Sequence, residues 1–200
     1  MTRFAARILV GSLAALCLAA LPAQAIPVDP QGLIRTDLLG RALAALDAHR
    51  GEADPTHIVV VDYSRRSDER RAYIVNLETG LVEAALRAAH GSGSDPDHDG
   101  FLDKFSDTPG SSASPEGAYL LAEQYVGRHG RSLRLDGLDR TNANARDRAI
   151  VIHAADYAEP TFLQRWGKLG RSNGCIVFSK ADLATFLKDV PERTLVFVGK

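Results

Sequence analysis

The sequence predicts a mainly β domain of the α+β class, in which short strands form a β-sandwich or a barrel-like arrangement. Short apolar runs rich in β-branched residues recur along the chain between Gly- and Pro-containing turns, which is typical of such folds. Helical spacing of apolar residues is confined to one segment near the N-terminus and one after Cys175. Many short strands with few helices argue against a doubly wound sheet. The chain also has no Gly-rich phosphate loop and no dinucleotide-binding pattern.

The individual elements follow from the spacing of apolar residues. Apolar residues between Leu33 and Ala48 recur at helical spacing and predict an N-terminal helix. Ser179, with Asp182 three residues later, is expected to cap a second helix that runs to about Val190. Strands are predicted at residues 57–63, 71–77, 81–89, 117–126, 132–138, 149–153 and 194–198, and the alanines of 81–89 also suit a helix.

Residues 1–25 predict a secretory signal peptide. Arg3 and Arg7 precede the apolar run 8–21, and a small-x-small cleavage site at 23–25 follows it. An uncleaved membrane anchor is the alternative, but the run is short for a spanning helix and no second apolar stretch is long enough. We therefore expect one domain over residues 26–200, exported to the periplasm or cell envelope.

Charge and cysteine content narrow the classes of function. Residues 26–200 contain 22 basic and 25 acidic residues, a net charge of −3, which argues against a nucleic-acid binder held by bulk charge. Cys17 lies within the predicted signal, so Cys175 is expected to be the one thiol of the exported domain, with no intrachain disulfide. A lone thiol in an oxidising compartment is reactive, paired between molecules, or buried and inert. Because Cys175 follows a glycine turn, we expect its thiol to be accessible rather than buried in the core.

Cys175 and His153 are the candidate catalytic pair. An imidazole can take the proton of a thiol and form the thiolate nucleophile of acyl transfer. His153 ends a predicted strand, and Gly174 lets the chain turn so that the N–H groups of Gly174 and Cys175 can point at an oxyanion. Ser172 is expected either to contact substrate or to brace the turn. The alternative is a buried structural Cys beside an unrelated His.

Several motifs give this chain a specific resemblance. The segments 150–153 (Ile-Val-Ile-His) and 170–175 (Gly-Arg-Ser-Asn-Gly-Cys) resemble the murein L,D-transpeptidase catalytic domain family. Further similar segments follow the same order over residues 58–198: His90-Gly91-Ser92-Gly93, Phe105–Ser111, Tyr125-Val126-Gly127 and Ser132–Leu138. The resemblance implies an L,D-transpeptidase-like β-sandwich and an enzyme that requires no cofactor.

The resemblance also implies a reaction on peptidoglycan stem peptides. Cys175 would attack the carbonyl between the L-centre of diaminopimelate and the terminal D-Ala of a tetrapeptide, with His153 as general base. D-Ala would leave, and an amine of a neighbouring stem would resolve the thioester into a 3→3 cross-link. Resolution by water would make the protein an L,D-carboxypeptidase, and a non-catalytic, calcium-stabilised cell-wall-binding domain is the third hypothesis. The sequence does not assign an oligomeric state.

The chain departs from the family at positions near the nucleophile. Members of the family often carry His before Gly-Cys and Arg or Asn two residues after Cys, where this chain has Asn173 and Val177. These departures leave open which residue holds the substrate carboxylate. Arg171 is a candidate, with a structural or solvated arginine as the alternative, and Asn173 is expected to contribute to the oxyanion or substrate-binding site. His90 is expected either to line the cleft or to anchor the long loop through hydrogen bonds.

Residues 95–103 resemble the first part of a calcium loop. The acids Asp95, Asp97, Asp99 and Asp103, with the backbone carbonyl of Phe101, occupy ligand positions, and Gly100 allows the sharp turn. The position of the bidentate Glu of an EF-hand is Ser106, so a ligand from elsewhere would be needed. A structural Ca²⁺ is the hypothesis and a solvated acidic loop the alternative, with zinc disfavoured by the oxygen-rich donors.

Overall fold

A computed structural model describes residues 26–200, so the predicted signal peptide lies outside the described residues. The chain begins with helix α1 (Thr36–Ala48) and strands β1 (His57–Asp62), β2 (Ala72–Asn76) and β3 (Val82–Leu86). Next come the hairpin β4 (Gly117–Gly127) and β5 (Gly130–Gly137), then β6 (Val151–Ala154), α2 (Pro160–Trp166), β7 (Ile176–Phe178), α3 (Lys180–Asp189) and β8 (Leu195–Gly199). Over residues 26–200, no helix is sufficiently long and apolar to cross a membrane.

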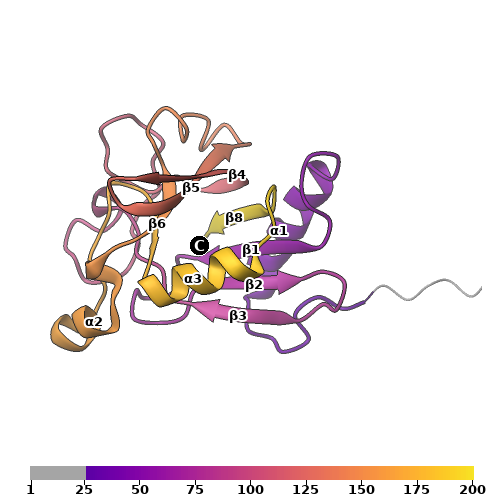
Figure 1. Ribbon diagram of the computed structural model, residues 1–200, viewed down its shortest axis with the longest axis horizontal. Helices are drawn as coiled ribbons and strands as arrows, with labels where there is room; N and C mark the ends of the chain where they lie inside the picture. The colour runs from indigo at the N-terminus through magenta and orange to yellow at the C-terminus, as the bar shows by residue number, and fades with distance from the viewer. Residues whose placement is uncertain (1–25) are drawn as a thin grey trace, which may run out of the picture.

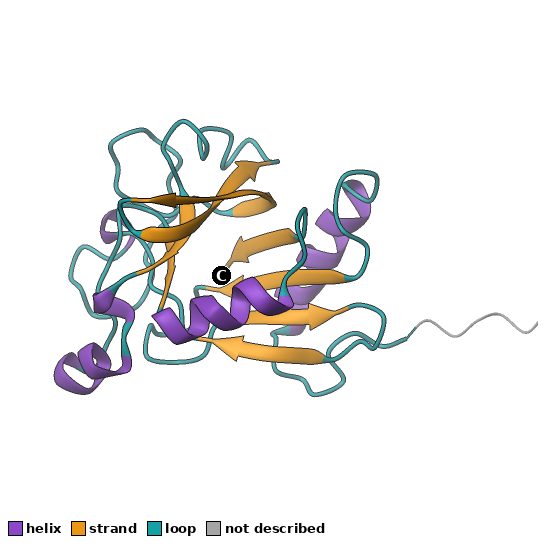
Figure 2. Cartoon of the chain, in the orientation of Figure 1, coloured by secondary structure: helices purple, strands orange, loops and turns teal. Residues whose placement is uncertain are grey.

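The eight strands form one continuous sheet in the order β3-β2-β1-β8-β4-β5-β6-β7. Only β1–β8 and β6–β7 pair in parallel, and the other neighbours are antiparallel. Along β4 the pairing with β5 shifts register between Leu121 and Gln124, an irregularity that increases strand twist. Figures 1 and 2 show that β4, β5 and β6 lie at an angle to β1, β2 and β3.

Two apolar clusters cover the two faces of the central strands. Helix α1 buries Leu38 and Ala42 against one face, while α3 buries Leu183 and Phe186 on the other. The alternating side chains of β1 supply both clusters, with Ile58 and Val60 facing α1 and with Val59 and Val61 facing α3. Figure 1 shows the two helices on opposite sides of this part of the sheet.

The structure confirms the mainly β fold class and the two predicted helices. α1 begins at Thr36 rather than near Leu33, because the Asp29 carboxylate accepts the N–H groups of Leu33 and Ile34 in a turn before the helix. Ser179 caps α3 as expected, and its Oγ accepts the N–H of Asp182. The ambiguous segment 81–89 contains strand β3. Helix α2 was not predicted, because at seven residues it buries no side chain and has no apolar stripe to detect.

The long segment between β3 and β4 packs behind the turn that carries Cys175. Ser114 Oγ accepts the N–H of Gly91 and donates to the carbonyl of Gly174. Ser172 donates its N–H to the carbonyl of His90 and accepts from Ser92 N–H. All of these partners lie in the segment between β3 and β4. This segment therefore forms a wall that fixes the turn of residues 171–175, which we call the cysteine turn.

Candidate active site

Cys175 and His153 lie on neighbouring strands at the edge of the sheet. Cys175 immediately precedes β7, and the parallel pairing of Ile152 with Ile176 places it beside Val151 of β6. Since alternate residues of a strand point the same way, Val151 and His153 share one face. Both line a single cavity with Cys175. The sheet register therefore brings together the thiol and the imidazole that the sequence paired.

The cavity has a volume of about 450 Å³ and lies between the β4–β5 hairpin and the cysteine turn. Five residues that the sequence predicted for the site line it: Cys175, His153, Asn173, Arg171 and Ser172. The sequence did not point to the other lining residues, which are Tyr125, Arg128, His129, Arg148, Ala149, Val151 and Tyr157. Most of these come from the hairpin and from the segment before β6, which reach the site only through sheet pairing.

The turn before Cys175 is braced by Ser172. Its Oγ accepts the N–H of Gly174 at 3.1 Å and donates to the carbonyl of Cys175 at 2.8 Å. Gly174 has φ of +117°, and a Cβ there would lie 2.7 Å from the carbonyl oxygen of Ala113. The Gly174 N–H is thus occupied, and the expectation that it points at an oxyanion is not met. Of the two roles weighed for Ser172, the structure shows the bracing one.

His153 is held in one tautomer by the backbone. Its Nδ1 lies 3.0 Å from the carbonyl oxygen of Ala154, which can only accept, so Nδ1 carries the proton and Nε2 has a free lone pair in the neutral ring. The ring of His129 stacks on it at 4.3 Å. Burial lowers the pKa of His153, the Ala154 hydrogen bond opposes this, and the nearby His129 and Arg128 lower the pKa further. The imidazole is therefore a neutral base near pH 7.

Cys175 is the one free cysteine of the described residues, and its thiol is half-buried. The Sγ–H donates to the carbonyl of Ala149 at 3.7 Å, a residue in the left-handed region with φ of 52°. Burial raises the pKa of the Cys175 thiol, against the opposing effects of backbone N–H groups and the charge of Arg148. The resting pair is thus a neutral thiol beside a neutral imidazole.

Arg148 supports the wall of the site. Its guanidinium donates to the carbonyl oxygens of Ser106 and Ala113 at 2.8 and 2.6 Å and pairs with Asp107 at 3.3 Å. Its side chain is 5% exposed, so this buried charge needs those acceptors. It thereby ties residues 106–113 to the segment that precedes β6. A sequence signal existed only in its position five residues before His153.

His90 does not line the cavity. It is 1% exposed, its Nδ1 accepts from the Arg71 guanidinium at 2.8 Å, and its Nε2 therefore carries the proton that it donates to Asp95 at 3.2 Å. Burial and the charge of Arg71 lower the pKa of His90 to about 4. Of the two roles weighed for His90, the structure gives it the anchoring one, as the centre of a buried Arg71–His90–Asp95 chain.

The Asp95–Asp103 loop uses its first acid for its own fold. The Asp95 carboxylate accepts the N–H groups of Asp99 and Gly100 at 3.0 and 3.2 Å, as well as the His90 proton. Asp97, Asp99 and Asp103 are exposed. Within residues 26–200, no group of three or more His, Cys, Asp or Glu side chains converges as a metal site would require. The calcium hypothesis stays a prediction.

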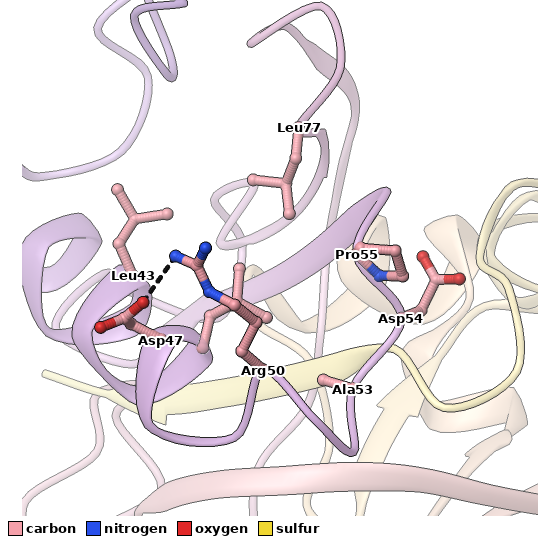
Figure 3. A pocket seen from close by; sticks show the side chains of 8 residues that line it. Leu43, Asp47, Arg50, Ala53, Asp54, Pro55 and Leu77 are labelled. Carbon is pink, nitrogen blue, oxygen red and sulfur yellow. Dashed lines mark hydrogen bonds and ion pairs between the residues drawn. The ribbon is translucent and has the colours of Figure 1, made fainter. Parts of the chain in front are cut away.

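A second hollow lies far from this chemistry, at the C-terminal end of α1 (Figure 3). It has a volume of about 340 Å³ and an apolar lining that includes Leu43, Leu46 and Leu77. Its charged residues include Asp47 and Arg50, which pair with each other. It contains no thiol or imidazole. The Cys175 cavity is therefore the better candidate active site.

The model of the family described as L,D-transpeptidase catalytic domain matches residues 31–198. No curated protein is similar enough to count as a match.

Among solved structures, an L,D-transpeptidase from Mycobacterium smegmatis is 15% identical, with a TM-score of 0.43 over 72% of this chain and 59% of that one. The corresponding values for an L,D-transpeptidase from Xylanimonas cellulosilytica are 19% identity and a TM-score of 0.42, over 78% and 68% of the two chains. For one from Mycobacterium tuberculosis they are 16% and 0.45, over 73% and 58%. The matched region is thus less than two thirds of the Mycobacterium chains.

Proposed function

The chain belongs to the L,D-transpeptidase catalytic domain family, and we propose that it is a cysteine acyltransferase acting on tetrapeptide stems of peptidoglycan. The observation that carries the proposal is the shared cavity of Cys175 and His153 on adjacent parallel strands. The predicted signal peptide leads us to propose that it acts in the periplasm or cell envelope, where such stems are found.

The first step in the proposal is thiol activation. Because Nδ1 of His153 donates to the carbonyl of Ala154, Nε2 is the atom that accepts the thiol proton. Since the resting thiol and imidazole are both neutral, the proton moves as the sulfur attacks, rather than residing on His153 beforehand. The thiol must first leave the carbonyl of Ala149, to which it donates in the free protein.

Acylation then releases D-Ala. Sγ forms a bond to the diaminopimelyl carbonyl carbon, the carbon–nitrogen bond to D-Ala breaks, and Nε2 of His153 returns its proton to the leaving amine. With the N–H of Gly174 occupied, the N–H of Cys175 remains the candidate oxyanion donor from the turn. Attack by an amine of a second stem on the thioester forms the 3→3 cross-link, and attack by water gives a carboxypeptidase.

The test uses purified protein, disaccharide-tetrapeptide muropeptides and mass spectrometry, with Cys175→Ala alongside. We expect a dimer that has lost one D-Ala, and at least a thousandfold less of it with the variant, because a lost nucleophile is not replaced. D-Ala loss without dimer would assign the carboxypeptidase activity. No Cys175-dependent product would contradict the proposal and favour a non-catalytic cell-wall-binding domain.

A further inference from the structure

The lining of the Cys175 cavity differs in charge from the rest of the protein. The whole chain has a formal net charge of −1, yet the cavity is lined by three arginines, two histidines and no acid. Arginine near a partly desolvated site favours carboxylates, because its planar donors match their geometry. The cavity is thus suited to an anionic ligand.

Two of the three arginines are engaged by the protein itself. Arg148 is nearly buried and donates to Ser106, Ser111 and Ala113 as well as to Asp107. One nitrogen of Arg171 donates to the carbonyl oxygens of Asp95 and Pro96, which ties this side chain to the loop. Arg148 therefore has few N–H groups left to bind a ligand, and Arg171 has only some of its N–H groups available.

Arg128 differs from both. It sits at the exposed turn between β4 and β5, and among the described residues its guanidinium makes one side-chain contact, at 3.4 Å with Nε2 of His129. His129 in turn stacks on His153. The charge of Arg128 is close enough to His153 to lower its pKa. Among the three arginines of the cavity, Arg128 is thus the one with guanidinium N–H groups free for a ligand near His153, the proposed general acid and base.

The position beside His153 decides which part of the substrate Arg128 would meet. In the proposed reaction His153 returns a proton to the nitrogen of the leaving residue, so the leaving residue must lie next to the imidazole. When that residue is the last of the stem, its carboxylate is two bonds from this nitrogen. A group that neighbours His153 can therefore reach the terminal carboxylate.

We propose that Arg128 binds the C-terminal carboxylate of the residue that leaves, and so restricts the site to stems with one residue after the scissile bond. The inference rests on the proposed function for the identity of the leaving residue. It makes Arg128 a substrate-binding residue, and it answers for this chain how a substrate carboxylate is held when the position two residues after the nucleophile is Val177.

The test measures binding without turnover, by titrating Cys175→Ala protein with the disaccharide-tetrapeptide and with the same compound as its C-terminal amide. We expect the free acid to bind about tenfold more tightly, as one charge-assisted pair allows. Adding Arg128→Gln should remove this ratio, while Arg131→Gln, on the same hairpin but outside the cavity lining, should keep it. Circular dichroism verifies that each variant is folded.

The outcomes separate the two proposals. A preference that survives Arg128→Gln, or equal binding of acid and amide by the Cys175→Ala protein, overturns the role of Arg128 even if wild-type protein releases D-Ala. A preference that is lost with Arg128→Gln supports the carboxylate site even if wild-type protein shows no Cys175-dependent turnover, in which case the proposed reaction fails alone.

Discussion

The cysteine turn (residues 171–175) and the acidic loop (residues 95–103) pack against each other but use their polar groups in opposite ways. In the loop, the Asp95 carboxylate is filled by two backbone N–H groups and by His90. In the turn, Ser172 and Ser114 satisfy backbone groups, and the Cys175 and Asn173 side chains line the cavity. The first acid of the loop is therefore used by the fold itself, whereas the turn leaves its thiol and its Asn173 side chain at the cavity.

The largest expected effect concerns the cavity at the cysteine turn, where His153 lies with Cys175. His153→Gln should lower kcat/KM by about 10²–10⁴-fold, because it removes the proposed general base. Protonated His153 cannot accept the thiol proton, so wild-type activity should fall with decreasing pH, and the lowered pKa puts this acid limb below the usual value of about 6.5.

The measurement is release of D-Ala across the pH range for wild type, His153→Gln and His57→Gln. The last is a matched control in β1 that does not line the cavity. A His153→Gln variant that retains full activity with an unchanged acid limb would remove His153 from the mechanism.

A smaller effect is expected on the loop side, where His90 contributes to stability rather than to turnover. The folded-state pKa of His90 is about 4, against about 6.5 in an unfolded chain. Between these values the unfolded chain binds a proton that the folded protein does not, so the free energy of unfolding should fall as pH decreases from 6.5 to 4. Urea denaturation at several pH values measures the slope, which should flatten in His90→Gln; an identical slope in both proteins would contradict this role.

The smallest effect concerns calcium. A bound Ca²⁺ would have to compete with the three hydrogen bonds that Asp95 already accepts, and these favour an unchanged melting temperature on chelation. The comparison is a melting curve with EDTA and with added CaCl₂, beside metal analysis of the protein. A melting temperature that chelation lowers and calcium restores would establish the loop as the predicted structural site, and would show that its carboxylates are not all used by the fold.

Much of the fold was predictable because its elements have local signals. The apolar face of α1, the cap at Ser179 and the β-branched runs of β1 and β6 each depend on residues close together in the chain. The order of the strands and the angle at which β4 and β5 lie to the other strands have no such local signal. They depend on long-range pairing and on the irregularity near Leu121, which no local pattern marks.

The sequence by itself determined the chemistry available to this protein: a thiol at Cys175, an imidazole at His153 and a glycine, Gly174, that allows the turn before the thiol. It also carried a family resemblance that the family model confirms. Only the tertiary structure decided which other groups join them. It placed Arg128 and His129 at the cavity and withdrew His90 into a buried chain. The physical reason is that sheet register and burial, both set by contacts between distant residues, determine which polar groups are satisfied internally and which remain free for a substrate.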